Sequence, residues 1–331
     1  MNDATVYGAT VAPLQTLGAP TTITTARLAE RLGYGSLWVA EANGSEAFSL
    51  LGAVSVAAPT LGLGTGVLAL QLRTPPLAAM AAATLQQLAP DRDVFLGIGI
   101  SSPVVAGRWH GAAYTEHPLA QVREYVALVR ECLSGETVSF DGDYYHISKF
   151  RLSLRAGERV PKIVIGALNP RMLALAGEIA DGVLLNYLPA SLVPWSVEQI
   201  RKGGDARVYA YVHVGVTDRD RYAEAARRDL FSYAVVDAYA ANFARAGYAD
   251  AVAEVRAHHD ARERDAAIAA VSDAWVDGVQ IMGDAPHVQR SVQAYVDAGV
   301  ETPIVFPLPW AEDRAAVVEH TLTAALPASP A

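Results

Sequence analysis

The chain has 331 residues, of which 52% are hydrophobic and 18% are charged, and its formal net charge is −9 at pH 7. This composition excludes disorder for most of the chain, and an acidic balance without basic stripes argues against nucleic acid as a partner. The length fits either one large α/β barrel or two modest domains.

The beginning of the chain and its single cysteine favour a cytoplasmic protein. The N-terminus lacks the basic and apolar regions of a signal peptide. Cys132 lies in an amphipathic helical stretch, so we expect a buried thiol and no disulfide. The uncharged segment 47–72 is interrupted by glycines and Pro59, and its pieces are too short to cross about 30 Å of hydrocarbon. We predict a helix followed by a buried strand there, and no membrane contact.

Short β-branched or apolar runs alternate with helical patterns along the chain. Eight runs are predicted to be strands: 5–10, 36–40, 61–67, 94–100, 162–165, 182–186, 208–214 and 303–307. Thr74-Pro75 opens one intervening helix, and Pro118 opens another that ends at Gly135. Such alternation implies parallel strands with right-handed crossovers. The sequence therefore predicts an α/β fold, a (β/α)₈ or TIM barrel, with residues 1–331 as a single domain.

Two segments are longer than a minimal barrel needs. Residues 102–117, after the fourth strand, form a predicted loop that contains Trp109, His110 and Tyr114. Residues 217–277, after the seventh strand, are mostly helical and rich in Ala, Arg and Asp. No linker rich in Pro or Gly flanks the second segment, so we interpret it as an insertion within one domain. Loops at the C-terminal ends of barrel strands usually carry function.

The positions just beyond the strands are poor in catalytic groups. They include one carboxylate, Glu41, one histidine, His213, and the nearby pair Trp109-His110. No HxH, HExxH or CxxC spacing is present to hold a metal, and no G-x-S-x-G nucleophile motif occurs. Many glycines with few acids or bases suit a bound organic cofactor that supplies the chemistry itself.

Two strand ends are candidates for contact with such a cofactor. The fourth strand ends in the glycines of FLGIGIS, the last of which is Gly99, where glycine either permits a bend or makes room for a ligand. In IGALNPRML a strand ends at Gly166 and turns at Asn169 into a helix, which leaves N–H groups and a partial positive charge for an anion. Arg171 either adds a full charge there or is a solvated first-turn arginine.

Five segments in sequence order carry a family resemblance: LWVAEA, LGLGTGVLAL, RTPPLAAMAAATLQQLAPDRDVFLGIGIS, PLAQVREYVALVRECLSGETVSFDGDYYHI and PKIVIGALNPRMLALAGEIADGVLL. Together they resemble the luciferase-like family of oxidoreductases, the bacterial luciferase superfamily. VDGVQIMGDAPHVQRSVQAYVDAGVETPIVFP is similar to the closing helix and eighth strand of that family. The resemblance implies a TIM barrel and a homodimer formed through early helices. It leaves two cofactors open, because FMN-dependent monooxygenases share this scaffold with enzymes that use the deazaflavin coenzyme F420.

The motif GTGV favours the F420 branch. It is similar to a bulge in strand three at which that branch has a cis peptide bond behind the cofactor ring, here Gly66–Val67. The resemblance implies that the cofactor is held by Glu41, Gly66, Val67, Ala69, Gly99, Gly166, Ala167, Leu168, Asn169, Arg171 and Met172. We expect backbone groups to make most of these contacts.

Two departures from the family pattern bear on the reaction. The sugar-phosphate dehydrogenases of this branch end the strand-two motif in Asp-His and place a Glu after the strand-four glycines, where this chain has Ala42 and Ser102. The resemblance therefore favours a reductase, in which hydride passes from the deazaflavin to an electron-poor C=C or C=N group of a small substrate. The candidate catalytic residues are Glu41, His110 and His213, with Tyr114 as a further proton donor. The candidate pocket residues are Asn43, Ser102, Trp109, Tyr114 and Trp310, and we expect 102–117 to close as a lid.

Two alternatives remain. An FMN-dependent monooxygenase would use the same scaffold with oxygen as the oxidant. A non-catalytic barrel that binds a ligand would explain the missing acid and base at positions 42 and 102.

Overall fold

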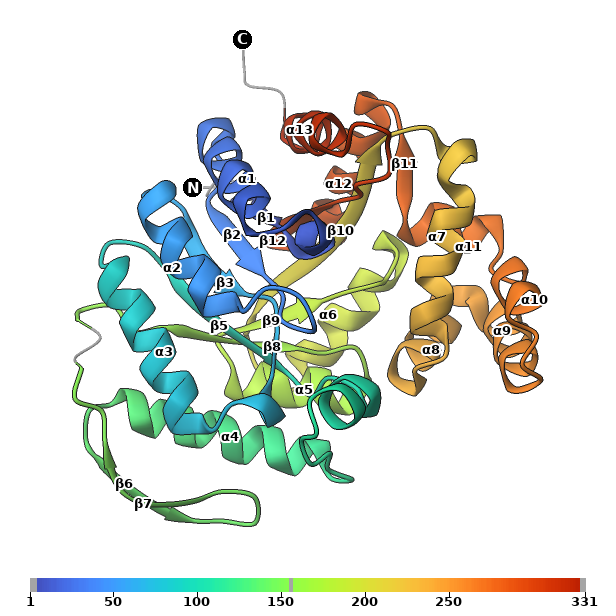
Figure 1. Cartoon of the computed structure of the whole chain (residues 1–331). Coiled ribbons are helices and arrows are strands. Elements are labelled where there is room, and N and C mark those ends of the chain that lie inside the picture. The colour runs from blue at the N-terminus through green and yellow to red at the C-terminus, as the bar shows by residue number, and fades with distance from the viewer. Residues whose placement is uncertain (1–4, 155–156, 328–331) are drawn as a thin grey trace.

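The computed structural model describes residues 5–154 and 157–327, and a ring of parallel strands lies at its centre (Figure 1). The strands of the ring are β1 (Gly8–Thr10), β2 (Ser36–Val39), β3 (Gly62–Thr65), β5 (Val94–Gly99), β8 (Lys162–Gly166), β9 (Gly182–Leu185), β10 (Arg207–Val216) and β12 (Thr302–Pro307). Each pairs in parallel with the next in this order, and β12 pairs with β1, which closes the ring. These strands overlap all eight predicted runs, so the predicted barrel is confirmed.

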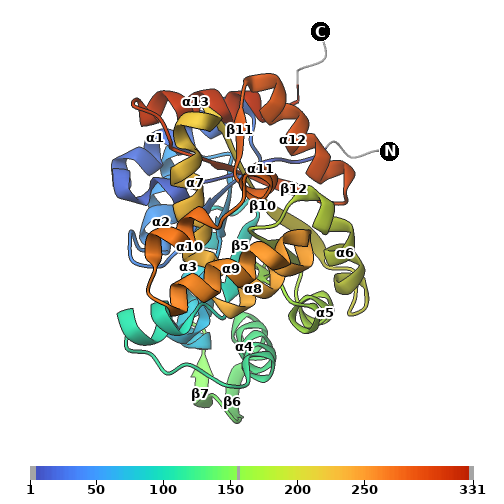
Figure 2. The ribbon, with the colours of Figure 1, turned by 90° about the vertical axis from the view of Figure 1, so that its right-hand side faces the viewer.

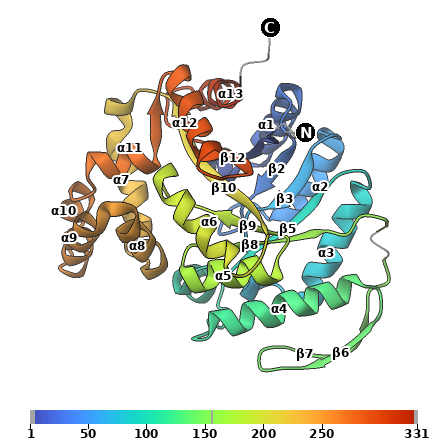
Figure 3. The ribbon, with the colours of Figure 1, turned by 180° about the vertical axis from the view of Figure 1, so that it is seen from behind.

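One helix follows each strand of the ring and packs around it (Figures 1 and 3). These helices are α1 (Ala19–Leu32), α2 (Ala47–Ala57), α3 (Pro75–Leu88), α4 (Pro118–Leu133), α5 (Pro170–Ile179), α6 (Val193–Arg201), α12 (Ala285–Asp297) and α13 (Arg314–Ala324). Their ends carry the signals read from the sequence. The Thr74 hydroxyl accepts a hydrogen bond from the Leu77 N–H at 3.4 Å where α3 begins. Gly135 follows α4 with a φ of +81°, a conformation that favours glycine.

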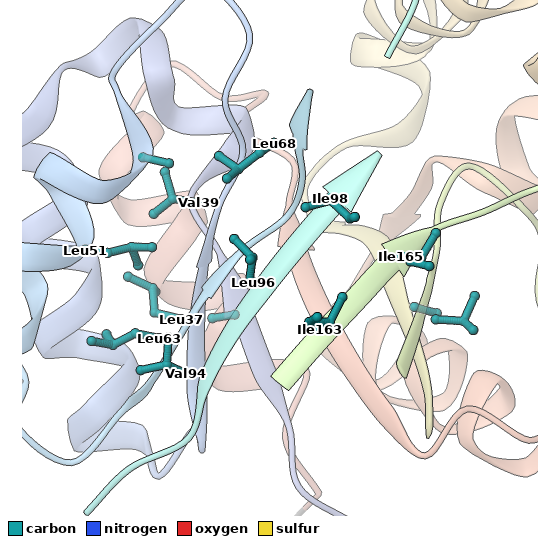
Figure 4. Packing of buried hydrophobic residues seen from close by; sticks show 14 of the residues in the cluster. Leu37, Val39, Leu51, Leu63, Leu68, Val94, Leu96, Ile98, Ile163 and Ile165 are labelled. Atoms are coloured by element: carbon teal, nitrogen blue, oxygen red, sulfur yellow. The ribbon is translucent and has the colours of Figure 1, made fainter. Parts of the chain in front are cut away.

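Alternate residues of the strands face two different cores. Leu37 and Leu63 lie between the strands and the surrounding helices, together with the other side chains labelled in Figure 4. Trp38 and Phe95 face the barrel interior, where their rings stack with centroids 4.9 Å apart. A Cβ atom at Gly64 would lie 2.6 Å from the Trp38 ring, so only glycine fits beside it. Side chains therefore fill the interior, and a ligand site belongs at the strand ends.

The predicted insertion 217–277 is helical, as expected. It comprises α7 (Arg219–Ala234), α8 (Asp237–Phe243), the π-helical turn η5 (Ala244–Tyr248), α9 (Ala249–Asp260), α10 (Arg264–Ala269) and α11 (Asp273–Val279). These helices lie together on one side of the barrel (Figures 1 and 2). They share a buried cluster that includes Leu230, Phe243 and Trp275. The insertion thus has an apolar core of its own. Its side chains outside this core are available to the mouth of the barrel.

A β-hairpin between α4 and β8 was not predicted from the sequence. Its strands β6 (Thr137–Asp141) and β7 (His146–Arg151) pair in antiparallel fashion. Their few apolar residues alternate with exposed polar ones, so they lack the continuous apolar runs that identified the barrel strands. The Glu124 carboxylate of α4 accepts hydrogen bonds from the backbone N–H groups of residues 143–145, at 2.7 to 3.1 Å. The turn is held by this distant side chain, which a local pattern cannot reveal.

Shorter elements complete the fold. Two-residue β4 (Leu68–Ala69) pairs with β5, and β11 (Ile281–Gly283) extends the sheet from β10. The 3₁₀ helices are η1 (Ala12–Leu17), η2 (Leu70–Leu72) and η4 (Ala190–Leu192). Among the helices formed by residues 5–154 and 157–327, none has the length and apolarity needed to cross a membrane.

Candidate active site

The floor of the candidate site is formed where β3 ends. The Gly66–Val67 peptide bond is cis, as predicted from the motif GTGV. Val67 packs over the neighbouring strands β5 and β8: a Cβ atom at Gly99 would lie 2.8 Å from Val67 Cγ2, and one at Gly166 would lie 3.3 Å from Val67 Cγ1. Glycine at these positions makes room for Val67. Both glycines were predicted cofactor contacts, and the structure brings them together with Val67.

Hydrogen bonds from neighbouring strands hold this floor. The Tyr211 hydroxyl, buried inside the barrel, donates to the Gly66 carbonyl at 2.6 Å. The Gly66 N–H donates to the Val39 carbonyl at 2.8 Å, and the Glu41 N–H donates to the Val67 carbonyl at 3.4 Å. Residues of β2 and β10, and Glu41 just beyond β2, thus fix the position of the segment that follows β3.

The Glu41 side chain anchors the loop beyond β2. Its Oε2 atom accepts a hydrogen bond from the Ala47 N–H at 3.0 Å and pairs with the Arg73 guanidinium at 3.1 Å. Arg73 also pairs with Glu46, the residue that caps α2. These contacts connect the starts of α2 and α3. They engage the carboxylate with a cation rather than leaving it free to move a proton.

His213 is buried at the top of the barrel interior. Its Nε2 bonds to Asn186 Oδ1 at 2.8 Å, and because that oxygen accepts, Nε2 carries the proton. Its ring stacks on Phe306 with centroids 3.9 Å apart. Burial lowers the pKa of His213 to about 3, and the adjacent Gln280 side chain offsets this shift only in part. His213 is therefore neutral at ordinary pH, which argues against the predicted role as an imidazolium proton donor.

Tyrosines and a carboxylate connect the insertion to the ends of β9 and β10. The Tyr187 hydroxyl donates to Asp229 Oδ2 at 2.9 Å, and Gln280 donates to the same oxygen. Burial raises the pKa of Asp229 to about 6. The Tyr239 ring of α8 meets the Tyr187 ring edge to face, with centroids 5.7 Å apart. The sequence analysis missed these contacts, because the residues lie far apart in the chain.

The loop from Gly166 to Met172, the predicted anion site, joins β8 to α5. Asn169 stands immediately before α5, but its side chain makes no capping hydrogen bond. Its amide Nδ2 donates to the Ala238 carbonyl at 3.4 Å, and its Oδ1 accepts from Arg245 at 3.3 Å. Arg171 in the first turn of α5 is exposed to solvent. The cation beside the loop is thus Arg245, which was not a predicted site residue.

The predicted loop 102–117 contains a helical segment. Pro103–Trp109 form a π-helical turn, η3, and the Ser102 hydroxyl accepts from the Val105 N–H at 3.2 Å where it begins. The expectation of an irregular loop is therefore corrected for these residues: Pro103 at the first turn and the Ser102 cap are sufficient signals for a short helix. Trp109 at its end has 56% of its surface exposed.

The rest of this loop approaches the mouth through two hydrogen bonds. His110 Nε2 donates to the Ala42 carbonyl at 2.5 Å, which ties the loop to the segment beyond β2. The Tyr114 hydroxyl donates to the Ser101 carbonyl at 3.3 Å. Both side chains thus lie on the side of the mouth near β2 and β5. Of the predicted proton donors, His110 and Tyr114 are exposed, whereas Glu41 and His213 are not.

The two remaining pocket candidates lie on opposite sides of the mouth. Asn43 is exposed in the loop beyond β2. Trp310 follows β12, packs against the apolar cluster of the insertion, and accepts a hydrogen bond at its carbonyl from the Thr217 hydroxyl at 2.5 Å. The structure therefore assigns Trp310 to the insertion side and Asn43 to the side of the 102–117 loop.

A second polar cluster lies at the opposite end of the barrel. Asp93 pairs with Arg159 at 2.9 Å and with Lys162 at 2.7 Å. With Arg207 and Tyr209 they line a cavity of about 320 Å³ at the starts of the strands. This end of a TIM barrel serves stability. Arg207 bonds there to the Thr302 hydroxyl at 3.0 Å and to the Glu301 carbonyl at 3.3 Å. Within the described residues no group of three or more His, Cys, Asp or Glu side chains could hold a metal ion.

The fold and the mouth together define a TIM-barrel protein whose site combines a backbone-built floor with few acids and bases. The chain belongs to the luciferase-like monooxygenase family, whose model matches residues 6–302. A Mycobacterium tuberculosis protein named as a coenzyme F420-dependent oxidoreductase is 31% identical over 314 residues, covering 84% of this chain and 88% of that protein. The 5,10-methylenetetrahydromethanopterin reductase of Methanolobus tindarius is 28% identical over 296 residues, covering 83% of this chain and 86% of the relative.

A solved structure has the same fold. The coenzyme F420-dependent tetrahydromethanopterin reductase from Methanopyrus kandleri superposes with a TM-score of 0.77 at 20% identity, covering 97% of this chain and 98% of that chain. The likeness thus extends across the barrel and the insertion.

Proposed function

We propose that the protein is a coenzyme F420-dependent oxidoreductase that transfers a hydride between the deazaflavin and a small organic substrate. The observation that carries this proposal is the family membership together with relatives that are named as F420-dependent oxidoreductase and as reductase. The absence of the acid and base at Ala42 and Ser102 favours reduction of an electron-poor C=C or C=N group over sugar-phosphate oxidation.

The residues at the mouth fit such a cofactor. The glycines beside Val67 make room for its side chain in the apolar floor, and a larger residue at Gly99 or Gly166 would press against it. Uncapped N–H groups at the start of α5 suit a phosphate. In this proposal the ring is held by Glu41, Gly66, Val67, Ala69 and Gly99, and the phosphate by Gly166, Ala167, Leu168, Asn169, Arg171 and Met172. When bound, the reduced deazaflavin supplies the hydride.

The chain's own residues would position the substrate, exclude water and supply a proton. Positioning alone is worth about 7 to 11 kcal/mol in favourable cases. We place the proton donor at His110, whose ring is exposed at the mouth although its Nε2 bonds to the Ala42 carbonyl. Glu41 is instead paired with Arg73, and His213 is buried and neutral. Asn43, Ser102, Trp109, Tyr114 and Trp310 would form the walls of the substrate pocket.

The reaction can be tested with an isotope. The protein is incubated with reduced deazaflavin carrying deuterium at C5 and with a panel of cyclic enones and imines. We expect deuterium on the former C=C or C=N carbon of a product. Oxygen consumption with FMN and oxygenated product would instead identify a monooxygenase. Ligand binding without turnover of any substrate class would support the non-catalytic barrel.

We further propose that the protein is a homodimer that forms through α2 and α3. These neighbouring helices carry no charged residue, and they expose Val56, Leu77, Met80 and Leu88 to 44% or more. Adjacent exposed apolar side chains of this kind mark an interaction surface. Because this patch is uncharged, a second copy of the same face suits it without placing like charges together.

The oligomeric state is measured by light scattering after gel filtration. The double variant Leu77→Glu, Met80→Glu should be a monomer, while Val160→Glu, at another exposed apolar residue, should remain a dimer. A monomeric parent protein would contradict this part of the proposal.

A further inference from the structure

Arg245 is a half-buried cation without a carboxylate partner. Its guanidinium stacks on the Trp195 ring at 4.3 Å and donates to Asn169 Oδ1 at 3.3 Å. Arg227 and Arg256 of the same insertion each pair with an aspartate, but among the described residues no acidic side chain pairs with Arg245. Burial lowers the pKa of Arg245, so its surroundings disfavour the charge. A nearby anion would compensate for that cost.

The start of α5 lies beside this cation and lacks a cap. Asparagine is among the best N-capping residues, yet Asn169 turns its side chain to Arg245 and to the Ala238 carbonyl. Pro170 has no N–H, so the N–H groups of Arg171 and Met172 are left at the first turn of this ten-residue helix. The uncapped N–H groups of the first turn of α5 and the Arg245 guanidinium therefore both lie beside Asn169, at the start of the helix.

This arrangement depends on the insertion. Arg245 comes from η5, 76 residues beyond Asn169 in the sequence. Ala238 of α8 and Arg245 of η5 both bond to the Asn169 side chain, and Arg245 also lies over Trp195 of α6. The insertion thus meets the start of α5 at this point. Arg171 belongs to α5 itself but is exposed, where a charge is weakened by water. Of the two arginines, Arg245 is the one fixed by packing.

We propose that Arg245 is a cofactor-binding residue that supplies the positive charge for the cofactor phosphate, acting together with the first-turn N–H groups of α5. This inference rests on the proposed function, since it assigns the phosphate to the deazaflavin. The guanidinium contacts the phosphate when the cofactor binds, while Trp195 and Asn169 hold it in position. The insertion, which lies far from the floor at Val67 along the chain, thereby contributes to cofactor affinity.

The test compares two ligands on the full-length protein. One is coenzyme F420, and the other is the same deazaflavin with its ribityl chain but without the phosphate. Dissociation constants for both are measured by fluorescence, without substrate, for the parent protein, Arg245→Gln, Arg245→Lys and the control Arg256→Gln. Melting temperatures are measured for all four.

We expect Arg245→Gln to weaken F420 binding by about 10- to 100-fold, the effect of losing a charged hydrogen-bond partner. Binding of the phosphate-free ligand should not change. Arg245→Lys should recover part of the loss, and Arg256→Gln should bind both ligands like the parent protein.

Three results would overturn the inference. In the first, the parent protein binds F420 more tightly than the phosphate-free ligand, and Arg245→Gln keeps that difference. The phosphate is then held by other groups, or Arg245 pairs with an anion of the substrate. If both affinities and the melting temperature fall together, Arg245 only supports the packing of the insertion. If the parent protein binds neither deazaflavin, the proposed function fails, and this inference fails with it.

Discussion

The two halves of the barrel mouth are built by different means. Over β3, β5 and β8 the surface consists of backbone and small residues around Val67, with Gly99 and Gly166 beneath it. Over β9 and β10 it consists of side chains that the insertion supplies, including Asp229, Tyr239 and Arg245. The first half presents an apolar floor and backbone N–H groups, and the second presents charged and aromatic side chains. In our proposal the planar ring binds over the first half, and the phosphate binds where the halves meet, between the start of α5 and Arg245.

The largest expected effect is on the glycine-built half. Gly99→Val adds a side chain whose Cβ alone would lie 2.8 Å from Val67 Cγ2, so the proposed cofactor floor must change shape. We expect cofactor affinity to fall by about 100-fold, or about 2 to 3 kcal/mol. Gly52→Ala, where an added Cβ meets nothing within 4 Å, is the control. Normal cofactor binding by Gly99→Val would show that the floor lies elsewhere.

The second prediction concerns the charge buried under the insertion. In the folded protein the pKa of Asp229 is raised from 3.8 to about 6. The protonated carboxyl therefore stabilises the folded state below about pH 4, and this contribution to the free energy of unfolding is lost as the pH rises through about 6. Asp229→Asn keeps an acceptor for Tyr187 but carries no charge. Allowing for partial solvent access, it should be more stable than the parent protein by about 1 to 2 kcal/mol at pH 8.

Urea unfolding between pH 4 and pH 8 measures this effect. The advantage of Asp229→Asn should shrink as the pH falls, and Asp250→Asn, at an exposed aspartate of α9, should show no such trend. An advantage that is independent of pH would mean that the carboxylate is not the cause.

The third prediction concerns the loop that faces the insertion across the mouth. Trp109 is exposed, and a closing lid would bring its ring over the substrate. Trp109→Ala should lower kcat/KM by about tenfold, through KM or kcat, with unchanged cofactor affinity and melting temperature. A loss of stability with normal kinetics would instead identify Trp109 as an anchor of the loop.

The smallest expected effect belongs to Arg171. Because water weakens a charge at this exposed arginine, a contact there would be worth about 1 kcal/mol, less than an ordinary charged hydrogen bond, so Arg171→Ala should weaken F420 binding by about fivefold. The fold should be unaffected. An effect larger than that of Arg245→Gln, measured in the same titration, would reverse the assignment of the two arginines.

The contrast between the halves also explains what could be predicted from the sequence. Each barrel strand is a short apolar run between turn signals, so all eight were identified. The cis Gly66–Val67 bond was implied by the resemblance of GTGV to the family's strand-three motif. The glycine-built half was predictable because its residues lie within or beside those strands. Cys132 was also found as expected, as a buried free thiol in α4.

The insertion half could not be derived in this way. Arg245 meets Asn169 only because the helices of the insertion fold back onto α5, and no periodicity reveals which face of a helix will do so. His213 was identified as a strand-end histidine, but its neutrality depends on burial beside Phe306 and Asn186. Local patterns predicted the elements of the mouth, and tertiary contacts determined the chemistry of its side chains.

Binding of the cofactor tests the central claim most directly. The purified protein is titrated with F420 and with FMN, and absorbance and fluorescence report each complex. We predict that F420 binds more tightly than FMN, and that Gly99→Val and Arg245→Gln each weaken F420 binding. Tight binding of FMN with no binding of F420 would contradict the account and identify a flavin monooxygenase.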